Sequence, residues 1–126
     1  MATPLTDLTS AVVLVLDRAA SVTFLRLATL ALAQALDLAT FAVMVERHGV
    51  GAEANPVVTD LFLTHGMTAV IFIKLALIVC IGALSVAALS KERNGGVWRM
   101  VGGLPLAFAI AAGLFGAITN TAVILS

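Results

Sequence analysis

A stretch of 23 residues, from Met67 to Leu89, contains a single charged side chain, Lys74. An α-helix of this length crosses the roughly 30 Å hydrocarbon core of a bilayer, because each residue adds about 1.5 Å. The chain has 126 residues, of which 61% are hydrophobic and only 11% are charged. So few charges do not cover the surface of a small water-soluble domain. The sequence therefore predicts a single all-α integral membrane domain over residues 1–126.

Two further apolar stretches, residues 22–45 and 104–125, are also long enough to span. Together with residues 67–89 they predict three transmembrane helices. Residues 4–21 carry polar and apolar side chains on opposite helical faces, which predicts an amphipathic helix lying in the membrane interface. Asn55-Pro56 is typical of a helix start and predicts a short outer-loop helix over residues 56–65.

Basic residues beside the predicted spans indicate the orientation of the chain. Arg18 and Arg26 lie near the start of the first span, and Lys91, Arg93 and Arg99 lie between the second and the third. Loops that face the cytoplasm carry an excess of Lys and Arg. The sequence therefore predicts an N-terminus inside, a C-terminus outside, and an outer loop between the first two spans.

Asp37 and Lys74 are charged residues within consecutive spans. With this orientation Asp37 lies roughly 12 Å below the outer surface and Lys74 roughly 10 Å below it. A lone charge at such a depth costs on the order of 2.5–3.5 kcal/mol, so the two are expected to form an ion pair. Gln34, Thr40 and Asn120 are expected to supply hydrogen bonds around this pair.

The pair has two interpretations, which the sequence leaves open. It can serve only to fix the register of two helices, which is an attested use of buried polar groups. Alternatively it can belong to a functional polar site that opens to the outer side, with Glu53 or Asn55 folded over it.

Small side chains follow one face of the first and of the third predicted span. Such faces let helix backbones approach closely in lipid, where van der Waals packing replaces the hydrophobic effect. The predicted packing residues are Ala31, Ala35 and Ala39 on the first span and Ala109, Gly113, Gly116 and Ala117 on the third.

No pattern in the sequence indicates catalytic residues, metal ligands or a cofactor, and none is predicted. His48 and His65 lie in the outer loop, but their spacing to the nearby carboxylates matches no metal motif. Cys80 is interpreted as a packing residue. The formal net charge of zero gives no reason to expect a nucleic-acid partner.

Asp37 with Thr40, the segment Gly51-Ala52-Glu53-Ala54-Asn55-Pro56, and Lys74 in the next helix resemble a family of small prokaryotic multi-pass membrane proteins. The resemblance extends from about Leu27 to Leu125, and no activity is assigned to that family. It implies three or four helices in a prokaryotic cytoplasmic (inner) membrane and a shared polar cluster at Asp37, Glu53, Asn55 and Lys74.

Three functions compete on this basis. The favoured one is an accessory subunit or homo-oligomer that packs through its Ala and Gly faces, with the lipid bilayer and other membrane helices as partners. The alternative is a component of ion or small-solute transport, with Asp37, Lys74 and Glu53 along a polar pathway. A lipid-active enzyme that uses Glu53 as acid or base ranks last, because no nucleophile or metal ligand accompanies it.

Overall fold

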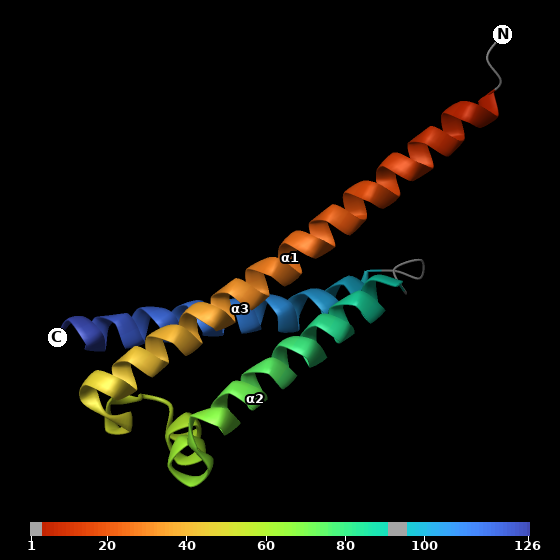
Figure 1. Ribbon diagram of the computed structural model, residues 1–126. Coiled ribbons are helices and arrows are strands. Elements are labelled where there is room, and N and C mark those ends of the chain that lie inside the picture. The colour runs from red at the N-terminus through yellow and green to blue at the C-terminus, as the bar shows by residue number, and fades with distance from the viewer. Residues whose placement is uncertain (1–3, 91–95) are drawn as a thin grey trace.

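Three long helices make up the fold in a computed structural model that describes residues 4–90 and 96–126. Helix α1 spans Pro4–His48, α2 spans Pro56–Ser90 and α3 spans Val97–Leu125, with a short 3-10 helix η1 at Val50–Ala52 between α1 and α2. Figure 1 shows α1 and α3 running in the same direction with α2 antiparallel to both. The N-terminal part of α1 extends well beyond the other two helices (Figure 1).

The long helix α1 joins two segments that the sequence predicts separately, residues 4–21 and 22–45. Its backbone is helical without a break from Pro4 to His48. Strong helix formers such as Ala and Leu dominate this range, and no glycine interrupts it before Gly49. The side chains that would define an amphipathic face over residues 4–21 lie largely outside the described set, so the interfacial placement of that segment stays a prediction.

Helix α2 begins at a capped N-terminus. The Asn55 side-chain oxygen accepts a hydrogen bond from the backbone N–H of Val57 at 3.0 Å, with Pro56 in the first helical position. Gly66 then interrupts the helical backbone with φ 75° and ψ −178°, a conformation that disfavours residues with a Cβ. The predicted short helix over residues 56–65 is thus the first part of α2, and its place at an outer interface stays a prediction.

Helix α3 begins seven residues before the predicted start at residue 104. Val97 is its first residue, and Gly102, Gly103 and Pro105 lie inside it. Pro105 has no N–H to donate to the carbonyl of Val101, but the remaining hydrogen bonds of the helix continue on both sides. Single prolines of this kind are tolerated in apolar helices. Lys91 and Arg93, on which the predicted orientation partly depends, lie outside the described residues.

Helices α2 and α3 meet closely at the end where the chain passes from one to the other. The Ser85 hydroxyl donates to the Gly102 carbonyl oxygen at 3.1 Å. A Cβ added to Gly102 would lie 2.7 Å from the Cβ of Ala88, so only glycine allows this approach. Toward the other end α2 and α3 diverge (Figure 1), while α1 packs mainly against α3.

Two apolar clusters hold the bundle together. Leu30, Leu106 and Ala109 form the first, between α1 and α3. Phe41, Met44 and Val70 form the second, near the η1 loop. There the Phe41 ring meets the Phe62 ring edge-on, with centroids 6.0 Å apart.

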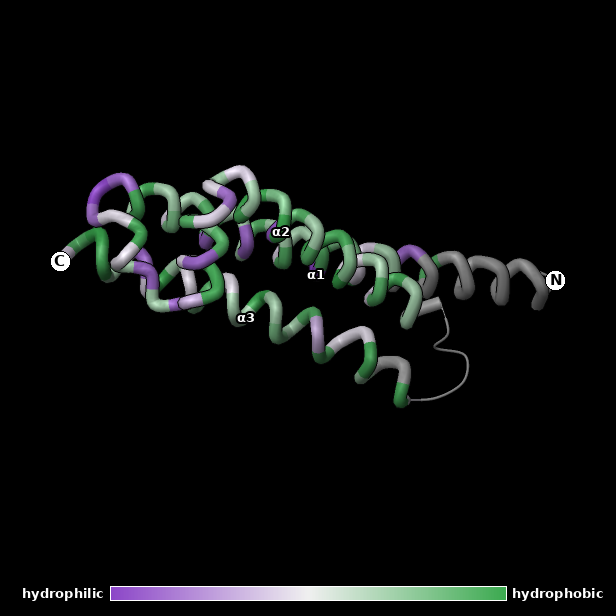
Figure 2. The backbone as a smooth tube through the Cα atoms, turned by 90° about the horizontal axis from the view of Figure 1, so that it is seen from below, coloured by the Kyte–Doolittle hydropathy of each residue, from purple (hydrophilic) through white to green (hydrophobic). Residues whose placement is uncertain are grey.

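In the part of the chain that the structure describes, three helices are long and apolar enough to cross a membrane: Ala20–His48, Pro56–Ala88 and Met100–Leu125. Large apolar side chains such as Phe72, Val79 and Ile118 are exposed on these helices. Hydrophilic residues gather at the end of the bundle that holds the C-terminus and the η1 loop (Figure 2). These features are those of a small membrane protein whose apolar helices contact a lipid bilayer.

Candidate functional site

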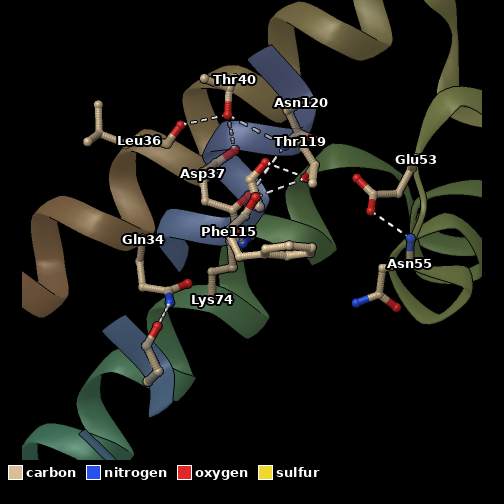
Figure 3. A network of polar contacts seen from close by, with 12 residues as sticks. Gln34, Leu36, Asp37, Thr40, Glu53, Asn55, Lys74, Phe115, Thr119 and Asn120 are labelled. Atoms are coloured by element: carbon tan, nitrogen blue, oxygen red, sulfur yellow. Dashed lines mark hydrogen bonds and ion pairs between the residues drawn. The ribbon is translucent and has the colours of Figure 1, made fainter. Parts of the chain in front are cut away.

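The two charges in the middle of the bundle form an ion pair between α1 and α2. The Lys74 Nζ donates a hydrogen bond to the Asp37 Oδ2 (Figure 3), which is the contact expected from their predicted depths. The side chains are only 17% and 15% exposed, respectively. At this burial each charge depends on the other for compensation.

A third helix completes the surroundings of Asp37. The Asn120 side-chain nitrogen, from α3, donates to the Asp37 Oδ1 at 3.3 Å and lies 3.4 Å from the Thr40 hydroxyl oxygen. Asn120 is buried, and the Thr40 hydroxyl also reaches the Leu36 carbonyl oxygen at 2.9 Å. The carboxylate of Asp37 is therefore the point where all three long helices share polar contacts (Figure 3).

Glycine at position 116 makes this convergence possible. A Cβ added to Gly116 would lie 2.7 Å from the Asp37 Cγ and would overlap the carboxylate. One turn earlier, a Cβ added to Gly113 would lie 2.8 Å from the Gln34 Nε2 and 3.0 Å from the Ala33 carbonyl. The small face of α3 thus leaves space for the backbone of α1 and also for two of its polar side chains, Asp37 and Gln34.

Gln34 is placed apart from the ion pair, contrary to the expected hydrogen bond around it. Its side-chain nitrogen donates to the Ala109 carbonyl oxygen of α3 at 2.7 Å, and the side chain is buried. Gln34 lies about one helical turn before Asp37, so its amide faces a different turn of α3. It ties α1 to α3 rather than supporting the charged pair.

Glu53 and Asn55 lie at the η1 loop and bond to each other. The Glu53 Oε1 accepts a hydrogen bond from the Asn55 backbone N–H at 2.8 Å. Within residues 4–90 and 96–126 neither of them forms a hydrogen bond or an ion pair with Asp37 or Lys74, and Figure 3 shows both on a separate loop. Glu53 and Asn55 nevertheless belong to the same site, because they line one cavity together with Asp37 and Lys74.

An open cavity of about 510 Å³ lies beside the ion pair and is lined by all three long helices and the loop. Several of its lining side chains, such as Phe108 and Phe115, are largely exposed, so the cavity is open to the surroundings of the bundle. Polar groups on its wall include Asp37, Lys74, Glu53, Asn55 and Thr119. The rest of the wall is mostly apolar. Its lining residues are Gln34, Phe41, Ala54, Val58, Leu61, Val70, Ile73, Leu77, Ile81, Phe108, Ala109, Ala112, Gly113, Phe115 and Gly116.

The apolar lining and Thr119 were not identified from the sequence. Phe108 and Phe115, for example, resemble any other lipid-facing residues in an apolar helix. The predicted polar cluster did include the charged and amide residues of the wall. The sequence does not indicate which side chains of α3 face the other two helices and which face outward.

The predicted packing residues divide into two groups. Ala109 and Gly113 are buried and Gly116 and Ala117 are half-buried on α3, where the small face contacts α1. Ala31, Ala35 and Ala39 are exposed on α1, because α1 uses its opposite face for contacts within the chain. The alanine face of α1 is therefore open in the single chain.

Among the residues that the structure describes, no group of three or more His, Cys, Asp and Glu side chains is arranged to hold a metal ion. His48, His65 and Cys80 are exposed. No family model matches the chain, and neither a curated protein nor a solved structure is found to be similar to it.

Proposed function

We propose that this small membrane protein binds a ligand within the membrane, in the cavity beside the Asp37–Lys74 pair. The observation that carries the proposal is the cavity itself. Its volume of about 510 Å³ lies in the range of small-molecule sites, and a few polar groups converge on a mostly apolar wall. An ion pair that only fixed helix register would need no such space beside it.

The position of the cavity argues for binding rather than for a continuous pathway through one chain. Lining residues on α2 run from Val58 to Ile81, whereas α2 and α3 close on each other at Ser85 and Gly102. A role in transport of an ion or small solute would therefore require a second copy or a partner. We place the site in the outer half of a prokaryotic inner membrane, with the N-terminus inside, from the distribution of basic residues and the family resemblance.

Native mass spectrometry of the protein extracted from its own membrane tests the proposal. We expect an adduct of one small molecule or lipid per chain. Ala112→Phe, which places a ring inside the cavity, should remove it. Ala111→Phe is the matched control, because Ala111 and Ala112 are both exposed and only Ala112 lines the cavity. Identical adducts in both variants would contradict the proposal.

A second candidate function, self-association or membership of a larger membrane complex, is favoured by one specific observation. Ala31, Ala35 and Ala39 form an exposed stripe of small side chains on α1. In lipid such a stripe permits close packing against another helix. Association through this stripe would leave the cavity accessible. The residues of α1 that line the cavity are Gln34, Asp37 and Phe41, and none of them belongs to the stripe.

Ala35→Leu should weaken such an association about tenfold, since an overpacked interface costs roughly 1–3 kcal/mol. Analytical ultracentrifugation in density-matched detergent measures the dissociation constant. Leu36→Phe, at an exposed position about 100° around α1 from Ala35, is the control. A wild-type chain that sediments as a monomer at all concentrations would exclude self-association under these conditions.

A further inference from the structure

The cavity is elongated along the helices. On the part of α2 that follows Gly66 its lining extends from Val70 to Ile81, and on α3 from Phe108 to Thr119. Each interval covers eleven residue steps, which corresponds to about 16 Å at 1.5 Å per residue. This is about half of the hydrocarbon thickness, so the cavity can hold an alkyl chain of medium length in an extended form.

Polar and apolar groups occupy opposite ends of the cavity. Glu53 and Asn55 lie at the end next to the η1 loop, and the Asp37–Lys74 pair lies between them and the inner part. Beyond Lys74 the wall is formed by side chains such as Leu77, Ile81 and Phe108. The one polar side chain at that end, Gln34, uses its amide nitrogen on the Ala109 carbonyl. The cavity is therefore amphipathic along its length.

The charges at the polar end do not balance. Lys74 compensates Asp37, which leaves the Glu53 carboxylate as a surplus negative charge. Within residues 4–90 and 96–126, the only hydrogen bond recorded for the Glu53 side chain comes from the Asn55 backbone N–H, and no cation pairs with it. A cationic group placed there gains a partner, whereas an anionic group meets two carboxylates and a Lys74 that is already engaged.

We propose that the cavity binds a single-chain amphipathic molecule with a primary ammonium head group. The ammonium donates hydrogen bonds to Glu53 at the loop, and the alkyl chain runs past the Asp37–Lys74 pair toward Ile81 and Phe108. This inference deepens the proposed function and rests on it, because it requires that the cavity is a ligand site.

The test uses three probes with the same alkyl chain and different head groups: dodecylammonium, dodecanol and dodecanoate. The full-length protein is placed in phosphatidylcholine nanodiscs, because the quaternary ammonium of that lipid has no N–H to donate. Equilibrium binding of each radiolabelled probe is measured, and binding to empty nanodiscs is subtracted. We expect saturable binding of one dodecylammonium per chain, at least about tenfold tighter than dodecanoate.

Two pairs of variants test whether dodecylammonium binding depends on Glu53 and on the cavity. Glu53→Gln should weaken dodecylammonium binding about fivefold, the upper end for a partly exposed ion pair, and should leave dodecanol binding unchanged. Asp60→Asn, which removes an exposed carboxylate outside the cavity, should change neither. Ala112→Phe should abolish binding of dodecylammonium, and Ala111→Phe should not.

The possible failures can be told apart. Absence of saturable binding for all three probes, together with an unaltered adduct in Ala112→Phe, would overturn the proposed function itself. Saturable binding that is equal for the three head groups, or that ignores Glu53→Gln, would overturn the ammonium assignment and leave the cavity as a ligand site. Unlabelled lysophosphatidylethanolamine, a membrane lipid with one acyl chain and a primary ammonium, identifies the source: competition assigns the ammonium to a single-chain membrane lipid, and lack of competition assigns it to a free amphiphile.

Discussion

Replacing Gly116 by alanine should destabilise the protein by about 2–3 kcal/mol, the cost of an added methyl group that has no space. The new Cβ would lie 2.7 Å from the Asp37 Cγ, so either the carboxylate or the whole of α3 has to move. A displaced carboxylate loses its contacts with both Lys74 and Asn120. Graded addition of sodium dodecyl sulfate to the protein in mixed micelles, followed by circular dichroism, measures the free energy of unfolding.

Gly103→Ala is the matched control in the same helix. A Cβ added there meets no heavy atom within 4 Å, and alanine favours a helix over glycine by about 0.5–1 kcal/mol. We therefore expect Gly103→Ala to be neutral or stabilising. Equal stability losses in the two variants would show that the close approach of Gly116 to Asp37 does not limit packing.

Replacing Lys74 by methionine should cost about 3 kcal/mol of stability, because it leaves the Asp37 charge without its partner inside the apolar bundle. Methionine is unbranched and only one atom shorter than lysine, and it removes both the charge and the hydrogen bond that Lys74 donates to Asp37. The double variant Asp37→Asn with Lys74→Met should regain most of the loss, since neither charge remains. The same unfolding measurement provides both values.

The double variant also separates the two interpretations of the pair. If it folds and retains the membrane-derived ligand, the pair serves helix register alone. If it folds but no longer holds the ligand seen by native mass spectrometry, the pair belongs to the binding site. A double variant that is as unstable as Lys74→Met alone would contradict the coupling between the two charges.

Part of the site followed from counting residues along the helices. Because each residue adds a fixed rise, residue numbers place Asp37 and Lys74 at a common depth, and the structure has them in contact. Asn120 and Thr40 join them, whereas Gln34 does not. One of the two interpretations of the pair placed Glu53 or Asn55 over it as a lid. Both residues line the cavity, and neither bonds to either charge.

Element boundaries were less accurate where neighbouring helices can continue into one another. Residues 4–21 and 22–45 are one helix, and α3 begins at Val97 rather than at residue 104. Polar residues such as Asp17 and a proline such as Pro105 are local signals against a continuous apolar span. Neither ends the helix here, although Pro105 removes one backbone hydrogen bond.

The sequence by itself determined the class of structure: apolar stretches of sufficient length for three helices that can span a membrane, and a pair of charges that must compensate each other. The tertiary structure decided how each helix is rotated about its axis. In an apolar helix the lipid-facing and protein-facing residues are alike, so hydropathy does not distinguish them. That rotation brings Gly116 against Asp37, turns Ala35 outward, and leaves the cavity between α1, α2 and α3.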